Sequence, residues 1–219
     1  MKKFNLFSPK FVFALLALFA LTCTNPAKTT QKAPVVAGGT SEETNTLAYH
    51  EVLPAVGRDG RSKTALSFKT PNSFVASDGN KFSASVAFEI SAWFKIDTLP
   101  QKSAVPYNLV GKNDIFSLAL VNGACGAENP AFAFFLTEET SIFACKHAVL
   151  SKKPVKEGLW TFVEVKWDGR YLTLYQDNVQ VAKEERILAV LPYSNVPIYL
   201  GKSGISFAIE ELSLNTEAL

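Results

Sequence analysis

Apolar and polar residues alternate over several short segments of the chain. Residues 85–97 and 161–167 both show a period of two, which places successive side chains on opposite faces of a β-strand. In the first segment the apolar positions are Phe88, Ile90, Ala92, Phe94 and Ile96. These segments predict strands that bury one face and expose the other.

Turn signals separate the strand-like segments. Asp168-Gly169 predicts a two-residue hairpin turn between residues 161–167 and 171–175, and Asp177-Asn178 predicts a turn before residues 179–182. Further strands are predicted at residues 131–136, 198–200 and 207–214, the first as an inner strand because it is apolar throughout. Short strands at such spacing are typical of an antiparallel sandwich or barrel.

A helical period is missing from the same pattern. No segment repeats its apolar residues every 3.6 positions, and residues 183–189 could form one helical turn at most. The fold class predicted from the pattern is therefore all-β.

The N-terminus has the features of a targeting segment. Lys2 and Lys3 precede an apolar run of eleven residues, 11–21, which is too short to cross a bilayer as a helix but suits the core of a secretory signal peptide. We therefore predict a signal peptide over residues 1–22 and an exported protein.

Cys23 follows the apolar run directly. The segment resembles a bacterial lipobox, in which signal removal leaves a cysteine that receives lipid, although Ala20 and Thr22 stand where the pattern prefers Leu and a small Gly or Ala. We expect a lipoprotein anchored to a membrane through Cys23, facing the periplasm or the cell surface. The alternative is ordinary secretion, with Cys23 an incidental residue.

The next segment lacks the residues of a core. Residues 24–46 are rich in Thr, Pro, Ala, Lys and Gly and contain no aromatic residue, so they bury too little surface to offset the entropy of ordering. We predict a flexible tether over residues 23–48 and one domain over residues 49–219.

Charge and composition narrow the function. The 22 basic and 20 acidic residues give a formal net charge of +2, but Lys2, Lys3 and Lys10 lie in the targeting segment, and without them 19 basic residues face 20 acidic ones. This balance argues against nucleic acid as a partner, because binding to phosphates requires a basic surface. Hydrophobic residues make up 47% of the chain and charged residues 19%, which excludes wholesale disorder.

Several phrases occur in an order and spacing that resemble a known family. They are RDGRS at 58–62, ALSF at 65–68, FEISAWFK at 88–95, LVGK at 109–112, GLW at 158–160, WDG at 167–169, LTLY at 172–175, IYLG at 198–201 and IEEL at 209–212. Together they resemble the LamG-like jelly-roll domain of the concanavalin A-like lectin/glucanase superfamily. The chain departs from the family at Asn178, where Gly is common, and at Glu210, where Asp is common.

The resemblance implies a jelly-roll sandwich of two antiparallel sheets. It implies binding to glycans or to extracellular proteins only as a common property of the class, because a fold alone does not determine a function.

Two cysteines remain if Cys23 carries lipid. Cys125 and Cys145 bracket the run at residues 131–136, and an oxidising compartment favours a disulfide between them. The alternative, a metal site or a reactive thiol, has less support because the chain has no CxxC motif and only His147 nearby.

Candidate catalytic residues are sparse. His50 and His147 are the only histidines, and neither lies in a motif such as G-x-S-x-G. Glycosidases of this architecture carry an E-x-D-x-E strand, which is absent, and Glu89 and Glu164 are single acids in their strands. The adjacent acids Glu210-Glu211 would point to opposite faces of an extended strand. We therefore predict no enzymatic activity.

Ligand contacts are expected from an aromatic residue and a loop. Trp93 alternates with polar neighbours, so it shares a face with Lys95 rather than with the core, and its ring could stack on a sugar. The other two tryptophans, Trp160 and Trp167, could stack in the same way, but core packing is the commoner role. Asn113 and Asp114 could contact a ligand from a loop.

Related domains commonly bind calcium. The oxygen ligands that calcium prefers would come from loops. Asp78 and Asn80 are the candidate ligands, with Asn113 and Asp114 as further candidates. The alternative is turn formation, because Asp-Gly and Asn-Asp are turn formers. No organic cofactor is expected.

Taken together, the sequence predicts a non-catalytic module that binds a polysaccharide or an extracellular protein. Two alternatives remain open: a glycan-cleaving hydrolase or lyase with an unfamiliar pair of acids, and a structural protein of the cell envelope.

Overall fold

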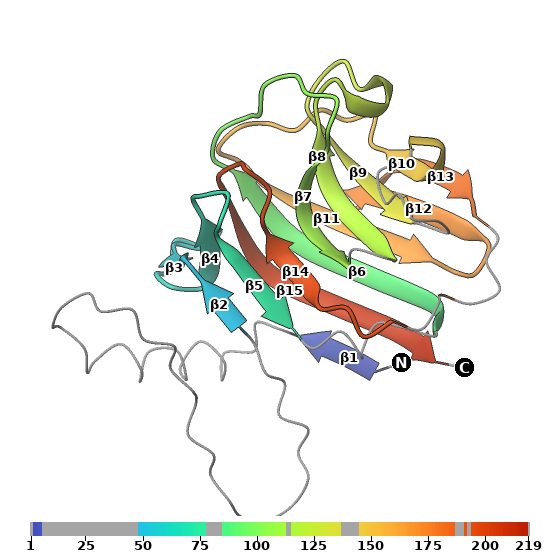
Figure 1. Cartoon of the computed structure of the whole chain (residues 1–219), viewed down its shortest axis with the longest axis horizontal. Helices are drawn as coiled ribbons and strands as arrows, with labels where there is room; N and C mark the ends of the chain where they lie inside the picture. The colour runs from blue at the N-terminus through green and yellow to red at the C-terminus, as the bar shows by residue number, and fades with distance from the viewer. Residues whose placement is uncertain are drawn as a thin grey trace, which may run out of the picture.

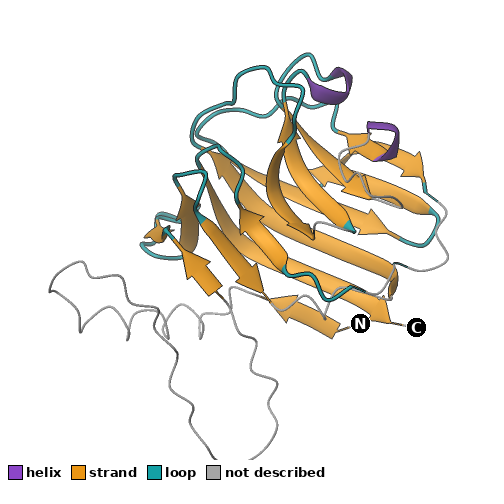
Figure 2. Cartoon of the chain, in the orientation of Figure 1, coloured by secondary structure: helices purple, strands orange, loops and turns teal. Residues whose placement is uncertain are grey.

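Two antiparallel β-sheets, sheet I of eight strands and sheet II of seven strands, stack face to face in the computed structural model of the chain. Sheet II lies in front of sheet I in Figure 1. The structure describes residues 2–5, 48–77, 85–112, 115–136, 145–186, 191 and 194–218. Within these residues strands dominate, and the helical elements are two short 3₁₀ turns, η3 (Ala124–Gly126) and η4 (Cys145–His147) (Figure 2). The predicted all-β jelly-roll sandwich is confirmed.

Sheet I has eight strands in the order β13-β12-β11-β6-β15-β4-β3, with β1 also paired to β15. Their bounds are β1 (Lys2–Asn5), β3 (Val52–Ala55), β4 (Ala65–Phe68), β6 (Ser85–Ile96), β11 (Trp160–Trp167), β12 (Tyr171–Gln176), β13 (Val179–Glu185) and β15 (Phe207–Ala218).

Sheet II has seven strands in the order β10-β9-β8-β7-β14-β5-β2. Their bounds are β2 (Ala48–His50), β5 (Phe74–Ser77), β7 (Tyr107–Lys112), β8 (Phe116–Val121), β9 (Ala131–Leu136), β10 (Ala148–Leu150) and β14 (Ile198–Gly201). As predicted, the apolar run of β9 is an inner strand, between β8 and β10.

The main core lies between the two sheets. Along β6, alternate residues from Phe88 to Ile96 are buried, and the residues between them lie on the outer face of sheet I. The ring of Phe94 contacts that of Phe132 from β9 at 5.8 Å between centroids, which joins the two sheets. The period of two in the sequence thus gives the buried face and the exposed face of sheet I.

The two predicted hairpin turns differ in outcome. Asp177 and Asn178 connect β12 to β13, and both have positive φ, as a type I′ turn requires. The turn after β11 is displaced by one residue from the prediction: Trp167 pairs with Leu172 and the Asp168 N–H donates to the Tyr171 carbonyl, so Gly169 and Arg170 are the central residues. Gly169, at φ 87°, takes the first central position, where a type II′ turn needs glycine.

The strand after the Asp177-Asn178 turn is longer than expected. The sequence pattern predicts a strand over residues 179–182, followed by one helical turn at most. In the structure, β13 continues in extended form to Glu185. Its last three residues pair with Tyr171, Leu172 and Thr173 of β12. β13 is longer because it pairs with β12 up to Glu185. The local sequence does not show which strand will lie beside it.

Strand β1 lies at the edge of sheet I. It pairs with the second half of β15, from Ser213 to Thr216, while β4 pairs with the first half. The four residues of β1 belong to the segment that the sequence predicts to be a signal peptide. Removal of the signal peptide would leave residues 213–216 of β15 without the partner strand β1.

A disulfide connects Cys125 of η3 to Cys145 of η4, as predicted, with their Cα atoms 5.1 Å apart. The bond holds the η3 loop over a second apolar cluster on the outer face of sheet II. The cluster comprises Ala119, Val121, Ala124, Ala127, Ala131, Ala133 and Phe135. Both faces of β9 are buried for this reason.

We expect loss of the disulfide to destabilise the domain. A closed loop of this length contributes about 3 kcal/mol in the chain-entropy model, and an opened η3 loop would also expose the cluster beneath it. The measurement is urea unfolding of the protein with and without reductant, and of the double variant Cys125→Ser/Cys145→Ser. The double variant should be as stable as the reduced protein, and reductant should not change its stability. Equal stability of the oxidised and fully reduced protein would contradict the expectation.

Candidate functional site

Three aromatic side chains lie together on the outer face of sheet I. Trp93 of β6 is paired with Phe162 of β11, and their ring centroids are 5.3 Å apart. Trp160, two residues along β11, is paired with Lys95. All three aromatic side chains are half-buried, and we call Trp93, Trp160 and Phe162 the aromatic patch. An aromatic surface that solvent reaches on an outer sheet face is suited to contact a ligand.

A cation lies over the ring of each tryptophan of the patch. The guanidinium of Arg58 is 4.5 Å from the centroid of the Trp93 ring, and the Lys95 ammonium is 5.6 Å from that of Trp160. Both are within the range of cation–π attraction. The cation over Trp93 lies closer to its ring than the cation over Trp160 does.

Arg58 is held in place by two acids. Its guanidinium donates to both oxygens of Glu211 at 2.9 Å, and its backbone N–H donates to Glu210 at 3.0 Å. The Glu210 side chain is only 5% exposed, so this contact is largely shielded from water. The loop that carries Arg58 is thereby fixed to β15.

The expectation that Glu210 and Glu211 point to opposite faces is wrong. Glu211 has φ 55°, and the pairing of β15 with β6 shifts register between Glu210 and Ser213. Such a bulge interrupts the alternation of side chains. Both carboxylates therefore reach Arg58, where they balance its charge.

Lys95 has a weaker partner. Its ammonium is 3.8 Å from Asp97, while Lys69 approaches the same carboxylate at 2.6 Å. Partial burial raises the pKa of Asp97, but hydrogen bonds from Lys69 and Ser206 outweigh it and hold the pKa below its usual value. Asp97 is thus an anion held mainly by Lys69, and Lys95 remains available beside Trp160.

A second group of charges lies farther along the same face. Glu89 of β6 and Glu164 of β11 both approach the ammonium of Lys166, at 3.6 and 3.1 Å. Partial desolvation lowers the pKa of Lys166, but the hydrogen bond to Glu164 and the charges of both acids outweigh it and raise the pKa. Glu89 and Glu164 thus lie within ion-pair distance of a single ammonium.

Trp167, the third tryptophan of the sequence, is a core residue. It is 1% exposed, its ring contacts Phe88, and its indole N–H donates to the Arg186 carbonyl at 3.0 Å. Its position on the buried face of β11 excludes it from the aromatic patch.

The loop residues predicted to bind calcium or a ligand cannot be compared with the structure. Asp78, Asn80, Asn113 and Asp114 lie outside the described residues, as does Cys23. Calcium binding and the loop contacts therefore stay predictions.

Other candidate chemistry is limited in the described part of the chain. His50 stacks on Phe74 at 5.3 Å, with its Nδ1 2.9 Å from the Asn72 carbonyl oxygen, at the exposed edge of sheet II. Among the described residues, no three His, Cys, Asp or Glu side chains cluster as metal ligands would. The same residues include no helix long and apolar enough to span a membrane.

Two residues of the site were missed by the sequence analysis. Phe162 could have been found, since it occupies the outer positions of β11 together with Trp160, Glu164 and Lys166. Arg58 could not, because its contact with Glu211 joins positions 153 residues apart. Trp93 and Lys95 do lie on the outer face together, and their binding to a ligand stays a prediction.

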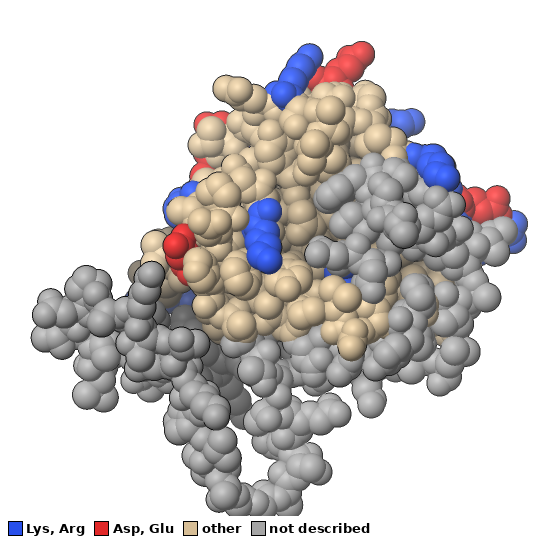
Figure 3. Space-filling model, in the orientation of Figure 1, with Lys and Arg blue, Asp and Glu red and all other residues tan. Residues whose placement is uncertain are grey.

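The two outer faces of the sandwich differ. Figure 3 shows the side of sheet II, where charged side chains are sparse over the middle of the visible protein surface and more frequent around its margin. The outer face of sheet I instead combines the aromatic patch with ion pairs along β6 and β11. It therefore offers more groups for recognition.

Residues 68–215 match a family model described as the concanavalin A-like lectin/glucanases superfamily. No sequence among curated proteins matches that of the chain.

Solved structures share the fold at low identity. The binding domain of Paraclostridial Mosquitocidal Protein 1 has a TM-score of 0.63 and 16% identity over 81% of this chain and 45% of its own. Domain 4 of AbnA, an extracellular arabinanase from Geobacillus stearothermophilus in complex with arabinotriose, has 0.54 and 19% over 80% and 77%. The binding domain of Botulinum Neurotoxin DC in complex with SialylT has 0.58 and 12% over 82% and 45%. The chain thus spans less than half of the two toxin domains.

Proposed function

Because the chain belongs to the concanavalin A-like lectin/glucanases superfamily, we propose that it is a non-catalytic binding module for a polysaccharide. The observation that carries the proposal is the aromatic patch on the outer face of sheet I. Sugar rings present apolar C–H faces that pack on aromatic planes, and Arg58 and Lys95, which lie over the rings of Trp93 and Trp160, can donate hydrogen bonds to sugar oxygens.

The similar structures support a glycan as the ligand class. One of them, domain 4 of an arabinanase, was solved with arabinotriose, and another, the binding domain of a neurotoxin, was solved with SialylT. At under 20% identity they support only the class of ligand. An extracellular protein is the alternative class of ligand.

The acids of sheet I support binding rather than cleavage. Hydrolysis of a glycoside needs two carboxyl groups on either side of the scissile bond, one of them protonated in most families. Glu89 and Glu164 instead share Lys166, and Glu210 and Glu211 share Arg58. Each pair of acids thus lies beside one cation.

The predicted location fits the same role. We propose that the signal peptide exports the protein, that Cys23 carries the lipid anchor, and that the tether over residues 23–48 holds the domain away from the membrane. The aromatic patch would then face polysaccharide outside the cytoplasm.

The test is binding of the purified protein to soluble polysaccharides, arabinan among them, by affinity electrophoresis and calorimetry. Trp160→Ala and Trp93→Ala should each weaken binding of a polysaccharide ligand by at least about fivefold, because each removes a stacking surface. Trp93→Phe should keep most of the affinity. Leu159→Ala, an exposed apolar residue beside the patch, is the matched control and should bind normally.

Two results would contradict the proposal. One is unchanged affinity in both alanine variants while their folds remain intact. The other is release of reducing sugar by the wild-type protein that Glu164→Gln abolishes, which would favour the glycan-cleaving alternative.

A further inference from the structure

Three aromatic side chains lie together on the outer face of sheet II, at the edge where β2 pairs with β5. His50 of β2 stacks on Phe74 of β5 with their ring centroids 5.3 Å apart, and Tyr199 of β14 meets the same phenyl ring edge-on at 6.0 Å. Val75, the next residue along β5, is fully buried, so Phe74 points outward. His50 is exposed, and Phe74 and Tyr199 are half-buried. We call these three side chains the sheet II cluster.

A lysine lies over this cluster. The Lys202 ammonium is 4.7 Å from the centroid of the Phe74 ring and 4.3 Å from that of Tyr199, within the range of cation–π attraction. The Lys202 backbone N–H donates to the Ser73 carbonyl at 3.0 Å, which fixes the position of the lysine in the loop after β14. Lys202 is exposed, and it forms no ion pair with an acid of the described residues. Aromatic surface and an uncompensated ammonium thus lie side by side.

This combination suits the boundary between a lipid bilayer and water. Amphipathic aromatic rings gather at the headgroup level of membranes, where the ring contacts apolar chains and its polar group contacts water. A lysine can lay its apolar stem along such a surface while its ammonium reaches the phosphates, and an anionic bilayer attracts it. Tyr199 and Lys202 supply both kinds of contact.

The chain itself connects the cluster to the predicted anchor. The predicted tether ends at Ala48, the first residue of β2, two positions before His50. Cys23 lies about 25 residues upstream, and a flexible chain of that length has a root-mean-square span of about 25–30 Å. The tether that carries the domain off the membrane is therefore short enough to bring the cluster back to it. Because β1 pairs with β15 in sheet I, removal of the signal peptide leaves the pairing of β2, β5 and β14 unchanged.

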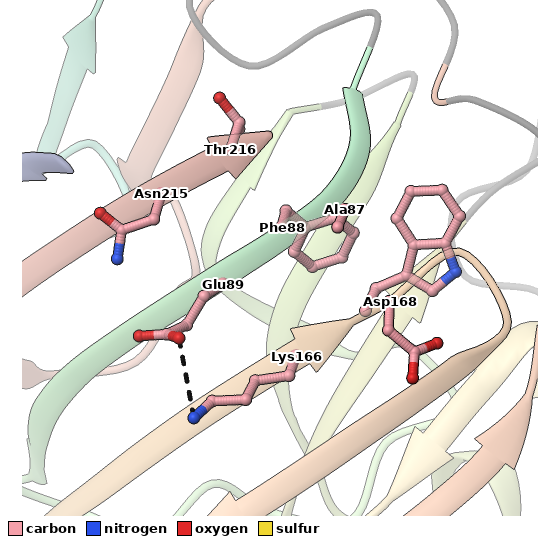
Figure 4. A pocket seen from close by; sticks show the side chains of 8 residues that line it. Ala87, Phe88, Glu89, Lys166, Asp168, Asn215 and Thr216 are labelled. Atoms are coloured by element: carbon pink, nitrogen blue, oxygen red, sulfur yellow. Dashed lines mark ion pairs between the residues drawn. The ribbon is translucent and has the colours of Figure 1, made fainter. Parts of the chain in front are cut away.

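The opposite face of the sandwich is less suited to an anionic bilayer. Glu89 and Asp168, together with Lys166, line a pocket of about 260 Å³ where β6, β11 and β15 run side by side (Figure 4). Backbone hydrogen bonds from Tyr171 and Arg170 lower the pKa of Asp168, so this carboxylate is an anion that anionic headgroups would repel. Charged side chains are sparse over the middle of the sheet II side in Figure 3. Sheet II is therefore the better docking face.

We propose that the sheet II cluster and Lys202 dock the domain on the headgroup region of an anionic lipid bilayer. The inference rests on the proposed function, in which the protein is anchored to a membrane, and adds the orientation of the domain there. The outer faces of two stacked sheets point in opposite directions, so docking through sheet II turns the aromatic patch away from the bilayer. The patch then faces the polysaccharide.

The test uses the mature chain, residues 23–219, coupled through Cys23 to a maleimide lipid. Cys125 and Cys145 form the disulfide, so Cys23 is the remaining cysteine of the three, and anchoring does not depend on natural lipidation. The anchored protein is placed in nanodiscs of phosphatidylglycerol and phosphatidylcholine that carry a gadolinium-chelating lipid, and NMR measures the broadening of its amide signals. Amides of β2, β5 and β14 should broaden several-fold more than those of β11 and β12.

Variants on the two faces identify the contacts. Lys202→Glu should lower the ratio of docked to undocked domain at least about fivefold, because it reverses the charge nearest the phosphates. Tyr199→Ala should also lower it. The matched control is Lys183→Glu, since Lys183 lies over the Tyr171 ring at 4.1 Å, the same kind of contact on sheet I. This control should keep the wild-type pattern of broadening, and nanodiscs of phosphatidylcholine alone should weaken docking of the wild type.

Two outcomes would overturn the inference. One is equal broadening of both sheets in the wild type, and the other is an unchanged pattern in Lys202→Glu and Tyr199→Ala variants whose melting temperatures show intact folds. Neither affects the proposed function, because Lys202→Glu should bind polysaccharide as the wild type does. Conversely, a wild type that docks as expected but binds no polysaccharide would overturn the proposed ligand and leave docking intact.

Discussion

Gly201→Ala is expected to destabilise the domain by about 3 kcal/mol or more, from the cost of positive φ and from steric overlap. Gly201 ends β14 with φ 88°. A Cβ atom there would overlap the carbonyl oxygen of Ser73 and lie 2.7 Å from the Phe68 ring. The Ser73 carbonyl also accepts the Lys202 N–H at 3.0 Å, so a shift to relieve the overlap would break that hydrogen bond. The measurement is the free energy of unfolding in urea.

Gly204 provides the matched control in the same loop. Its φ is 73°, and an added Cβ would meet no atom within 4 Å. Gly204→Ala should therefore cost only the backbone penalty, about 1–2 kcal/mol. Equal losses in the two variants would show that close packing around Gly201 contributes nothing, contrary to the expectation.

The sequence predicts the sandwich well because alternation is a local property. A period of two assigns Phe88, Ile90 and Phe94 to one face of β6 and Glu89, Trp93 and Lys95 to the other, whatever the neighbouring strands are. Aspartate, asparagine and glycine mark turns through their own backbone preferences. These signals need no knowledge of distant contacts.

The failures occur where pairing between strands decides the geometry. The register of β11 with β12 moves the turn to Gly169-Arg170, and a bulge in β15 brings Glu210 and Glu211 to the same arginine. A one-residue change of register reverses the face of a side chain. Local patterns report neither the register nor the bulge.

The candidate site shows the same division. The outward direction of Trp93 and Lys95 follows from their own strand, but the patch also needs β11 beside β6.

Phe94 and Phe162 allow stability and binding to be separated by one kind of substitution. They lie on neighbouring strands, where Phe162 pairs with Trp93 and Phe94 pairs with Thr161. Phe94 is fully buried between the rings of Phe132 and Phe207, at 5.8 and 6.3 Å, while Phe162 is half-buried on the outer face. The two side chains thus serve opposite faces of sheet I.

We expect Phe94→Ala to lower the free energy of unfolding by about 3–5 kcal/mol, because it leaves a cavity between the sheets. Phe162→Ala should cost less than about 2 kcal/mol, since its side chain is only partly removed from water. Affinity for a polysaccharide ligand should show the reverse order. Folded Phe94→Ala should bind normally at low temperature, and Phe162→Ala should bind several-fold more weakly because Trp93 loses its neighbouring ring. Urea unfolding and calorimetry measure the two quantities, and a Phe162→Ala variant that binds as the wild type does would remove Phe162 from the site.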